Sequence, residues 1–526
     1  MTPYAPDAWA YGGIPRVVGS LARGLARRGH EVTVCTTDAC DASARLPRRD
    51  HASEGSVDVR VFPNVSNRLA YHLQLFLPLG MHTFLGRAAR RFGVAHLHAC
   101  RNIPGVIAAY HLRRAGIPYV LAPNGTAPII ERRHAAKRVF DAVAGDRVVR
   151  GASRLLAVSD AERGQLLALG IDASRIRVIP NPIHVDEHGI HPHASVAGRF
   201  RERYRFGGQP IVLFLGRLSP RKRLDVLIRA FAQLCSPIAD SVRLVIAGND
   251  MGAEAAAHRL VGELGIQEHV TFTGLLTQGE RIEALVDADV TVYPSEHEIF
   301  GLVPFEALLA GTPVVVADDS GCGDLVGATG GGLVVPVNDV NTLARAIGEV
   351  LAYPAIWRLK AQRAQPRIRA SYGADVVCGE LEAVYQELVQ ARREQRDALK
   401  GVPYPIWNEP PERAIRDPEQ LACDGSHVID RGRGDSRRKR FEDGPAANGF
   451  KEPKLVRDVG HAVLIEHQLG LQLRLRPREL LARYAVSSDA AQFLEQNGLD
   501  RVEHGSLSCR DGHGVEERLL GWQHAA

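Results

Sequence analysis

The sequence lacks the cysteine spacings that mark metal sites and disulfide frameworks. Its 8 cysteines are scattered along the chain, without Cys-x-x-Cys pairs and without histidines at ligand spacing. Such cysteines are typical of reduced packing residues. We therefore expect a cytoplasmic protein rather than an exported one stapled by disulfides.

No segment has the length and apolarity of a membrane span. The most apolar stretch, residues 69–85, is interrupted by His72, Gln74, Pro78 and His82, which make it too polar to cross a bilayer. Residues 1–13 are polar and contain prolines, unlike a signal peptide. These features exclude an integral membrane protein from our expectations.

Charge of one sign is in small excess, because 65 Lys and Arg against 60 Asp and Glu give a net charge of +5. The basic run at residues 437–440 is more typical of a solvated linker than of a nucleic-acid site, and we expect no nucleic-acid partner. A second basic cluster consists of Arg132, Arg133, Lys137, Arg138, Arg147 and Arg150. It is typical of a solvated helix face, or alternatively of a surface that attracts phosphate-bearing acceptors or an anionic membrane.

A chain of 526 residues is too long for one core and predicts several domains. Two blocks of alternating strand and helix patterns predict an α/β protein with two Rossmann-like domains. The expected boundaries are residues 1–185, a connection at 186–209, a second domain at 210–371, a closing helix at 372–395 that returns to the first domain, and a tail at 400–526. The tail is charged and rich in Gly, so we expect it to be largely disordered.

The first candidate site residues are Gly12 and Gly13, which precede a helix pattern. Glycines at a helix start let the backbone approach an anion. A doubly wound domain normally begins with a buried strand before such a loop, yet only about ten residues precede Gly12. We expect that the strand is encoded upstream of the present Met1, since an interior parallel strand is not easily dispensed with.

Two further candidates follow later strands of the first block. His98 ends the pattern VAHLHA, and Asn124 follows the pattern IPYVLAP. A histidine at the end of a buried strand is either a satisfied core residue or part of a cleft, and both interpretations of His98 remain open.

The second block carries two cations and two carboxylates at one predicted sheet edge. Arg217 and Lys222 follow the strand pattern IVLFLG, whereas Glu298 lies in the loop after DVTVY and Glu306 lies in the next helix. The carboxyl ends of parallel strands are where open α/β sheets bind ligands. Fixed cations there can stabilise a diphosphate leaving group, while two carboxylates alone would also fit a general acid and base.

The order and spacing of these motifs resemble the family-4 retaining glycosyltransferases. The shared motifs are GGIPRVV, GHEVTV, AVSDAE, IPNPI, FLGRLSPRK, VIAGND, VTFTG, SEHEIFGLVPFEALLAGTPVV and GGLVVPVND, which together cover residues 3–390. The resemblance implies a GT-B fold of two facing Rossmann-like domains. It also implies a metal-independent transferase that moves a sugar, with retention, from a UDP- or GDP-sugar to a hydroxyl acceptor in polysaccharide, glycolipid or glycoside synthesis.

The same resemblance assigns roles to individual residues. Arg217 and Lys222 would bind the donor diphosphate, Glu298 the sugar hydroxyls and Glu306 the ribose. Gly301, Leu302 and Val303 would offer backbone N–H groups at a helix start. Gly12 and Gly13 would approach the donor from the other domain, and His98 and Asn124 would lie on the acceptor side.

Two positions depart from the family pattern. Asn124 stands where the family usually has His, and Arg223 stands where it usually has Gly. A sugar phosphorylase, a nucleotide-sugar epimerase and a non-catalytic nucleotide- or carbohydrate-binding protein remain alternative functions. The retaining reaction is commonly described as attack on the same face, in which the leaving phosphate takes the acceptor proton, and it requires no protein nucleophile.

Overall fold

The computed structural model describes residues 1–6, 8–41, 43–46, 52–54, 57–130, 133–183, 196–238, 242–400, 499–503 and 506–509. The chain divides into two compact units, Met1–Glu394 and Gln395–Ala526. In the second unit, β14 (Leu499–Glu503) and β15 (Ser506–Cys509) pair as an antiparallel hairpin. Most of the predicted disordered tail, including its basic run at 437–440, lies outside the described residues.

The N-terminal half of the first unit contains two small sheets. One has the strand order β1-β3-β2 and the other the order β4-β5-β6-β7. The strands are β1 (Val32–Thr37), β2 (Ala52–Glu54), β3 (Val57–Phe62), β4 (Ala95–His98), β5 (Tyr119–Ala122), β6 (Arg154–Ala157) and β7 (Ile176–Val178). All pairs are parallel except β2 with β3.

The backbone of the first two residues joins these sheets. The Met1 amino group donates to the His96 carbonyl at 2.8 Å, and the Met1 carbonyl accepts from the His98 N–H at 3.0 Å. The Thr2 N–H donates to the Cys35 carbonyl of β1 at 3.2 Å. Residues 1 and 2 therefore lie between β1 and β4, at the place where the sequence predicts a further strand.

Helices cover these sheets because their apolar residues recur on one face. In α1 (Gly13–Arg27), Val17, Leu21 and Leu25 are buried, whereas Arg27 is exposed. The other helices are η1 (Trp9–Tyr11), α2 (Asn67–Leu73), α3 (Met81–Ala88), η2 (Ala89–Arg91), α4 (Ile103–Arg114), α5 (His134–Phe140), the π-helical η3 (Asp141–Gly145), α6 (Asp146–Gly151), α7 (Asp160–Ala168) and η4 (Ala173–Arg175). Spacing at i, i+4 and i+8 is the helical period that the sequence predicts for α1.

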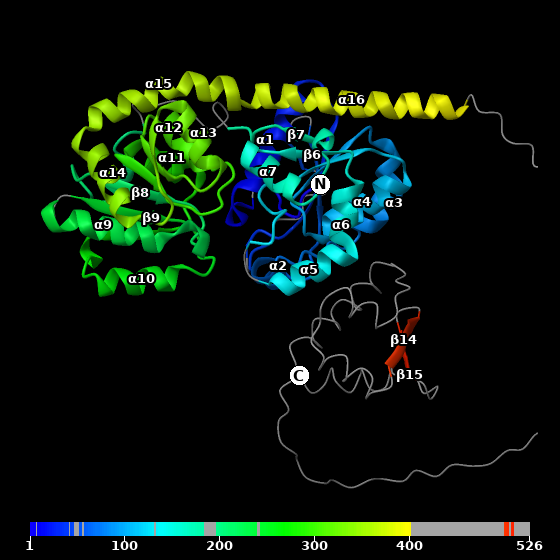
Figure 1. Cartoon of the computed structure of the whole chain (residues 1–526), viewed down its shortest axis with the longest axis horizontal. Helices are drawn as coiled ribbons and strands as arrows, with labels where there is room; N and C mark the ends of the chain where they lie inside the picture. The colour runs from blue at the N-terminus through cyan, green and yellow to red at the C-terminus, as the bar shows by residue number, and fades with distance from the viewer. Residues whose placement is uncertain are drawn as a thin grey trace, which may run out of the picture. The chain divides into compact units, whose positions relative to one another are not determined.

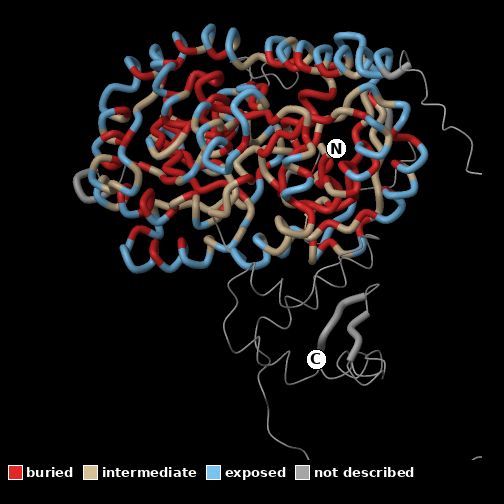
Figure 2. Tube along the Cα trace, turned by 45° about the vertical axis from the view of Figure 1, so that its right-hand side comes forward, coloured by how far each residue is buried: buried red, intermediate tan, exposed pale blue. Residues whose placement is uncertain are grey.

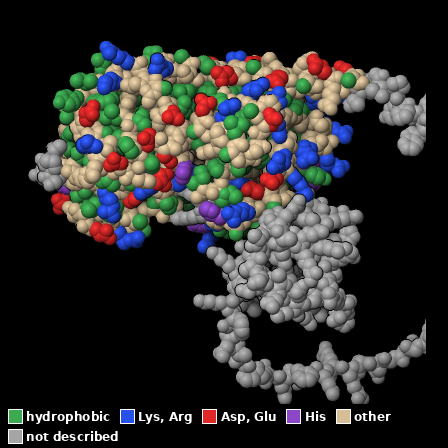
Figure 3. Space-filling view, in the orientation of Figure 1, with side chains coloured by type: hydrophobic (Ala, Val, Ile, Leu, Met, Phe, Trp, Pro, Cys, Tyr) green, Lys and Arg blue, Asp and Glu red, His purple; other side chains and the backbone are tan. Residues whose placement is uncertain are grey.

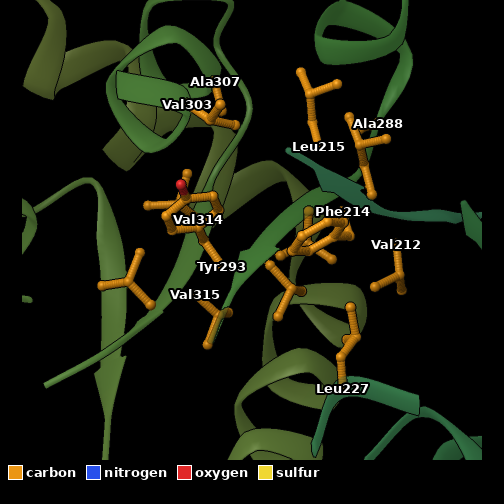
Figure 4. Packing of buried hydrophobic residues seen from close by; sticks show 14 of the residues in the cluster. Val212, Phe214, Leu215, Leu227, Ala288, Tyr293, Val303, Ala307, Val314 and Val315 are labelled. Atoms are coloured by element: carbon orange, nitrogen blue, oxygen red, sulfur yellow. The ribbon is translucent and has the colours of Figure 1, made fainter. Parts of the chain in front are cut away.

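The C-terminal half contains one parallel sheet of 6 strands in the order β10-β9-β8-β11-β12-β13. The strands are β8 (Ile211–Leu215), β9 (Arg243–Ala247), β10 (Val270–Gly274), β11 (Val290–Tyr293), β12 (Val314–Ala317) and β13 (Gly332–Val335). Every residue of β8, β11 and β12 is buried, as expected for central strands with helices on both faces. Figure 4 shows side chains of these strands packed together, among them Phe214, Tyr293 and Val315.

The helices of this half are α8 (Arg199–Tyr204), η5 (Pro220–Lys222), α9 (Leu224–Ile238), α10 (Glu254–Glu263), η6 (Gln267–His269), α11 (Gln278–Asp287), α12 (Leu302–Leu309), α13 (Gly321–Thr329) and α14 (Val340–Ala352). Buried segments run through the interior of both halves and exposed helix faces surround them (Figure 2). Each half of the first unit is therefore an α/β layer structure of the predicted class.

Helix α8 lies within residues 186–209, where the sequence shows little periodicity. The Asp287 carboxylate accepts hydrogen bonds from the backbone N–H groups of Gly198, Phe200 and Arg201, and the Phe200 side chain is fully buried. A helix of 6 residues is too short to reveal a period, so tertiary contacts decide its formation.

Two long helices, α15 (Pro354–Tyr372) and α16 (Ala374–Lys400), follow each other along one side of both halves (Figure 1). Val377, Leu381 and Val384 of α16 pack on the core that contains α1 and β5, and Glu382 forms an ion pair with Arg28 at 2.5 Å. Helix α16 is thereby attached to the N-terminal half.

The two places where the chain crosses between the halves lie next to each other. Ile183, which follows β7 and packs in the C-terminal core, donates its N–H to the Tyr372 carbonyl at 2.7 Å. Tyr372 ends α15, and Gly373 separates it from α16. Both crossings are therefore held at one point.

Candidate active site

Residues from both halves meet at the carboxyl ends of β8 and β11. A Cβ atom on Gly12 would lie 2.8 Å from Arg217 Nε, and one on Gly13 would lie 2.9 Å from Leu302 Cδ1. Gly12 also has a φ of +92°, which side chains disfavour. Larger residues at these two positions would therefore keep the N-terminal half away from Arg217 and α12.

Lys222, Tyr293 and Glu298 form a buried cluster at this sheet edge. The Lys222 ammonium donates to the Tyr293 hydroxyl and to Glu298 Oε2, and the Tyr293 hydroxyl donates to the same carboxylate oxygen at 3.1 Å. The ammonium also lies 4.3 Å from the centre of the Tyr293 ring, within range of a cation–π contact. The cluster joins the turn after β8, the end of β11 and the loop that follows β11.

Burial and pairing act in opposite directions on the charged members of this cluster. Burial lowers the pKa of Lys222, and the adjacent Glu298 offsets part of that effect. Burial raises the pKa of Glu298, but Lys222, Arg221 and the two hydrogen bonds outweigh it, so the pKa of Glu298 is lowered. The pKa of Tyr293 is raised well above its ordinary value by burial and by Glu298. We conclude that Tyr293 keeps its proton while Glu298 remains an anion.

Glu306 lies in α12 with a side chain that is 3% exposed, and it is paired with two arginines. Arg16 of α1 contacts Oε1, and Arg281 of α11 contacts Oε2 at 2.6 Å. Burial lowers the pKa of Arg281 to about 10, so Arg281 is still charged at neutral pH. Burial, with Arg281 next to it, lowers the pKa of Arg16 well below its ordinary value. Both carboxylate oxygens are thus occupied, one of them by an arginine from the opposite half.

Helix α12 begins where the sequence predicts an anion site. Gly301 precedes its first residue, Leu302, and adopts a φ of +75°. A Cβ on Gly301 would lie 2.6 Å from Cys322 Sγ, so only Gly fits between this turn and α13. Val303 is buried in the second helical position, and the helix start faces the same sheet edge as Lys222 and Glu298.

The two departures from the expected motif pattern both lie at positions with a left-handed backbone. Arg223 has a φ of +49° and Asn124 a φ of +51°, and both values lie in the left-handed region. Gly suits that region best, which explains the Gly expected at position 223, and Asn tolerates it better than most residues. The Arg223 guanidinium does not point a free charge at the site, because it bonds with Asp225, Glu296 and Asn338.

Of the two predicted acceptor-side residues, only Asn124 stands in a turn that meets the C-terminal half. The following residue, Gly125, has its Cβ position 3.3 Å from Ile299 Cδ1. His98 is 5% exposed and its ring stacks on that of His96 at 4.1 Å. Burial, with His96 next to it, lowers the pKa of His98 well below its ordinary value. His98 therefore has the surroundings of a neutral interior histidine.

A contact between the halves lies at the side away from α15 and α16, where α2 is drawn in Figure 1. The Asn249 side-chain amide donates to the Tyr71 hydroxyl at 2.9 Å and to the Ala10 carbonyl at 3.1 Å. The Tyr71 hydroxyl donates to the Asp250 carbonyl at 3.0 Å. These polar contacts close the edge of the site opposite the chain crossings.

Sequence reasoning missed Tyr293, Arg16 and Arg281. Tyr293 is the last residue of an apolar strand pattern, and Arg16 and Arg281 belong to ordinary amphipathic helices. A strand end next to the Glu298 loop was the one signal that pointed to Tyr293. Among the described residues, no group of three or more His, Cys, Asp or Glu side chains is arranged to hold a metal ion, and no helix there is long and apolar enough to cross a membrane.

The comparisons with known proteins agree with this geometry. The profile of the glycosyl transferases group 1 family matches residues 198–367, and that of the glycosyl transferase 4-like domain matches residues 12–182. The GDP-mannose-dependent alpha-mannosyltransferase of Mycobacterium tuberculosis is 31% identical over 72% of this chain and 94% of its own length. The D-inositol 3-phosphate glycosyltransferase of Kineococcus radiotolerans is 29% identical over 75% of this chain and 94% of its own.

A solved structure with the same fold is the sucrose-phosphate synthase of Thermosynechococcus elongatus, which covers 72% of this chain and 94% of its own at 22% identity and a TM-score of 0.57. That likeness confirms the predicted GT-B fold. The two family matches cover the C-terminal half and the N-terminal half that together form the site. The mannosyltransferase aligns with this chain over 94% of the mannosyltransferase's own length. The chain belongs to the group 1 glycosyltransferases and is an enzyme of the GT-B type with a family 4-like N-terminal domain.

Proposed function

We propose that this glycosyltransferase moves a sugar, with retention of configuration, from a nucleoside-diphosphate sugar to a hydroxyl acceptor. The observation that carries the proposal is the buried cluster of Lys222, Tyr293 and Glu298 at the carboxyl ends of β8 and β11. A cation and an anion fixed together at that edge provide one group for a diphosphate and one for sugar hydroxyls.

In this proposal Arg217 and Lys222 neutralise the diphosphate as it leaves, without a metal ion. Oriented cations in a site shielded from water stabilise developing charge without reorganising. Glu298 binds sugar hydroxyls, and the start of α12 at Gly301, Leu302 and Val303 offers backbone N–H groups. When the donor is absent, Glu298 holds Lys222 in place, and the arriving diphosphate takes over part of that charge pairing.

Glu306 would bind the ribose hydroxyls of the donor. Both of its oxygens are occupied in this structure by Arg16 and Arg281, so one partner has to release an oxygen for the ribose. Arg16 of α1 belongs to the other half of the protein, whereas Arg281 of α11 belongs to the same half as Glu306. We infer that Arg16 withdraws when the two halves separate and the donor enters.

The donor class can be tested by thermal unfolding with UDP, GDP and their sugars. We expect one base to stabilise the enzyme strongly, by about 2.7 kcal/mol at a hundredfold excess over Kd. The corresponding nucleoside without phosphates is the control, and it should stabilise far less because it cannot reach Arg217 and Lys222. Equal shifts with nucleoside and diphosphate would contradict the role of these cations.

The acceptor is proposed to be a hydroxyl of a glycan or of a lipid-linked glycan, entering from the N-terminal half. One relative is named for D-inositol 3-phosphate and another for mannosyl transfer, so the acceptor varies within the group while the transfer remains. Gly12, Gly13 and the Asn124 turn are the parts of the N-terminal half that approach the proposed donor site, at Arg217, Leu302 and Ile299 respectively.

We also propose peripheral contact with an anionic membrane on its cytoplasmic side. Helix α5 has no buried residue, Val65, Leu73 and Leu79 are 47–58% exposed, and the Arg133 guanidinium bonds to the His72 carbonyl beside them. Lys and Arg side chains also gather over α3, α4 and α6 (Figure 3). Exposed apolar side chains beside cations are the combination that anionic interfaces attract.

Sedimentation with vesicles tests this contact. We expect binding to phosphatidylglycerol vesicles at low salt and little binding to phosphatidylcholine, with about 1 kcal/mol for each basic residue at the surface. High salt screens the electrostatic contribution to vesicle binding and leaves the apolar one. Changing Leu73 and Leu79 to Ser should therefore remove most of the binding that remains at high salt. Equal binding to both lipids would contradict an electrostatic contact.

A further inference from the structure

Glu162 is a fully buried carboxylate that the proposed reaction does not use. It lies in the first turn of α7 and is 0% exposed. Its Oε1 accepts from the Gly125 N–H at 2.6 Å, and its Oε2 accepts from the Val158 N–H at 2.8 Å. Both of these partners are neutral backbone groups. A buried carboxylate without a cationic partner is costly, which calls for an explanation of its position.

The two N–H groups belong to loops that meet the other half near residues 294–301, the loop between β11 and α12 that carries Glu298, here called the donor loop. The Cβ position of Gly125 lies 3.3 Å from Ile299 Cδ1, the residue after Glu298. Val158 precedes Ser159, whose Oγ would lie 2.5 Å from a Cβ on Gly321. Glu162 thus fixes the two N-terminal loops that touch Ile299 of the donor loop and Gly321 of α13.

These contacts continue directly to Glu298. The residues before and after Gly321 both bond to the Glu298 carbonyl, Ser320 through its Oγ at 2.8 Å and Cys322 through its N–H at 2.9 Å. A displacement at Ser159 or Gly125 would therefore press on the backbone that carries Glu298. Errors of about 1 Å in such supports are enough to slow an enzyme about a hundredfold.

We propose that Glu162 is a positioning residue for sugar transfer, whose carboxylate holds the Asn124–Gly125 turn and the Val158–Ser159 loop against the donor loop. This inference rests on the proposed function, because it makes Glu162 the residue that supports the acceptor side of the proposed transferase site. The support depends on the anion, since two N–H donors converge on two acceptor oxygens. A protonated carboxyl group has only one strong acceptor, its carbonyl oxygen, because the oxygen that carries the proton accepts weakly, so one of the two bonds would be weakened.

The surroundings of Glu162 place this protonation in the neutral range. Burial raises the pKa of Glu162 from 4.5 to about 7, against the two hydrogen bonds that lower it. The titratable neighbour is the Cys100 thiol after β4, whose pKa burial raises to about 12. Helix α13 also packs against α7, and burial raises the pKa of its Cys322 thiol, which lies beside Glu298, well above the ordinary value. The nearby Arg101 is paired with Asp141 at 2.6 Å. Both thiols stay neutral near pH 7, so Glu162 is the group that titrates there.

The sign of the effect follows from this direction. Because the pKa is higher in the folded chain than in the unfolded chain, ionisation of Glu162 lowers folding stability as pH rises from about 4.5 to about 7. Sugar transfer depends on the ionised form of Glu162, so its rate should rise with pH over the same range in which folding stability falls. We expect kcat/KM for the acceptor to fall about tenfold per pH unit below pH 7, while binding of the nucleoside diphosphate stays nearly constant.

The decisive experiment compares the full chain with Glu162→Gln over pH 5.5–8.5. We expect the variant to be slow at every pH and to lack the acid limb, with unchanged calorimetric affinity for the nucleoside diphosphate. Glu349→Gln, at an exposed site in α14, is the matched control and should keep the wild-type profile. A wild-type rate and profile in Glu162→Gln would overturn the proposal. Failure of the proposed function would differ, because the wild-type enzyme itself would then neither bind nor transfer.

A second measurement needs no variant and covers the case in which Glu162→Gln does not fold. Amide hydrogen exchange of the wild-type enzyme, corrected for intrinsic rates, can be followed at pH 6 and pH 8. We expect peptides that contain Gly125 and Val158 to lose protection at pH 6, while peptides from β8 keep theirs. Equal protection of Gly125 and Val158 at both values would overturn the proposal.

Discussion

Replacement of Lys222 by Ala is expected to lower kcat for sugar transfer by about a hundredfold. Losing one preorganised electrostatic stabiliser typically has this effect, since it acts on charge that develops in the transition state. The Lys222 side chain is 6% exposed, so water does not replace it effectively. Steady-state rates with saturating donor and acceptor give kcat directly.

The same substitution should also destabilise the protein. It leaves Glu298 and the Tyr293 hydroxyl buried beside an empty position, and breaking one side of a buried ion pair costs about 3–5 kcal/mol. Rates should therefore be measured well below the midpoint of thermal unfolding. Lys360→Ala is a suitable control, because Lys360 lies over the Trp357 ring of α15 at 3.6 Å, in no contact with the cluster. If Lys222→Ala were as active as Lys360→Ala, Lys222 would not stabilise the leaving group.

Replacement of Glu306 by Ala is expected to lower kcat/KM for the donor by about a hundredfold. Two effects combine in this variant. The ribose loses its proposed acceptor, and Arg16 and Arg281 are left facing each other without a counter-ion. Like charges that were held about one carboxylate apart in a buried site repel strongly, so the halves should stay further apart.

Small-angle scattering and kinetics can separate the two effects. The variant should be more open than the wild-type enzyme without donor, and Arg16→Ala should restore much of the compact form to a Glu306→Ala chain by removing one of the two cations. A donor KM unchanged in Glu306→Ala would rule out ribose binding by Glu306. The exposed Glu349 again provides the control carboxylate.

The sequence predicted those features that follow from local pattern. The strands β8 and β11 are continuous apolar runs, and the loops after them carry Arg217, Lys222 and Glu298, so their meeting at one sheet edge follows from parallel topology. The start of α12 and the place of Glu306 in it were predicted for the same reason. Their roles in catalysis remain predictions.

The contacts that complete the site could not be predicted, because they depend on how distant elements pack. Arg16 reaches Glu306 across the two halves, and no spacing in the sequence links positions 290 residues apart. Glu162 looks like any acidic residue in the first turn of a helix, where the helix dipole favours negative charge. Only its burial and its bond to Gly125 distinguish it. The short helix α8 depends on Asp287 in the same way.

We expect the shared crossing point at Ile183 and Tyr372 to be the pivot about which the two halves open. Two chain crossings held at a single point leave the halves free to rotate about that point, but they resist sliding or separation of the halves. A rotation moves atoms in proportion to their distance from the pivot, and we expect it to break the contact between Tyr71 and Asn249, on the side away from α15 and α16. Opening of the two halves therefore requires that the hydrogen bonds of Tyr71 with Asn249 and Asp250 break. Gly373 separates α15 from α16, and we expect the backbone to change its torsion there when a nucleotide sugar enters and when the halves close again.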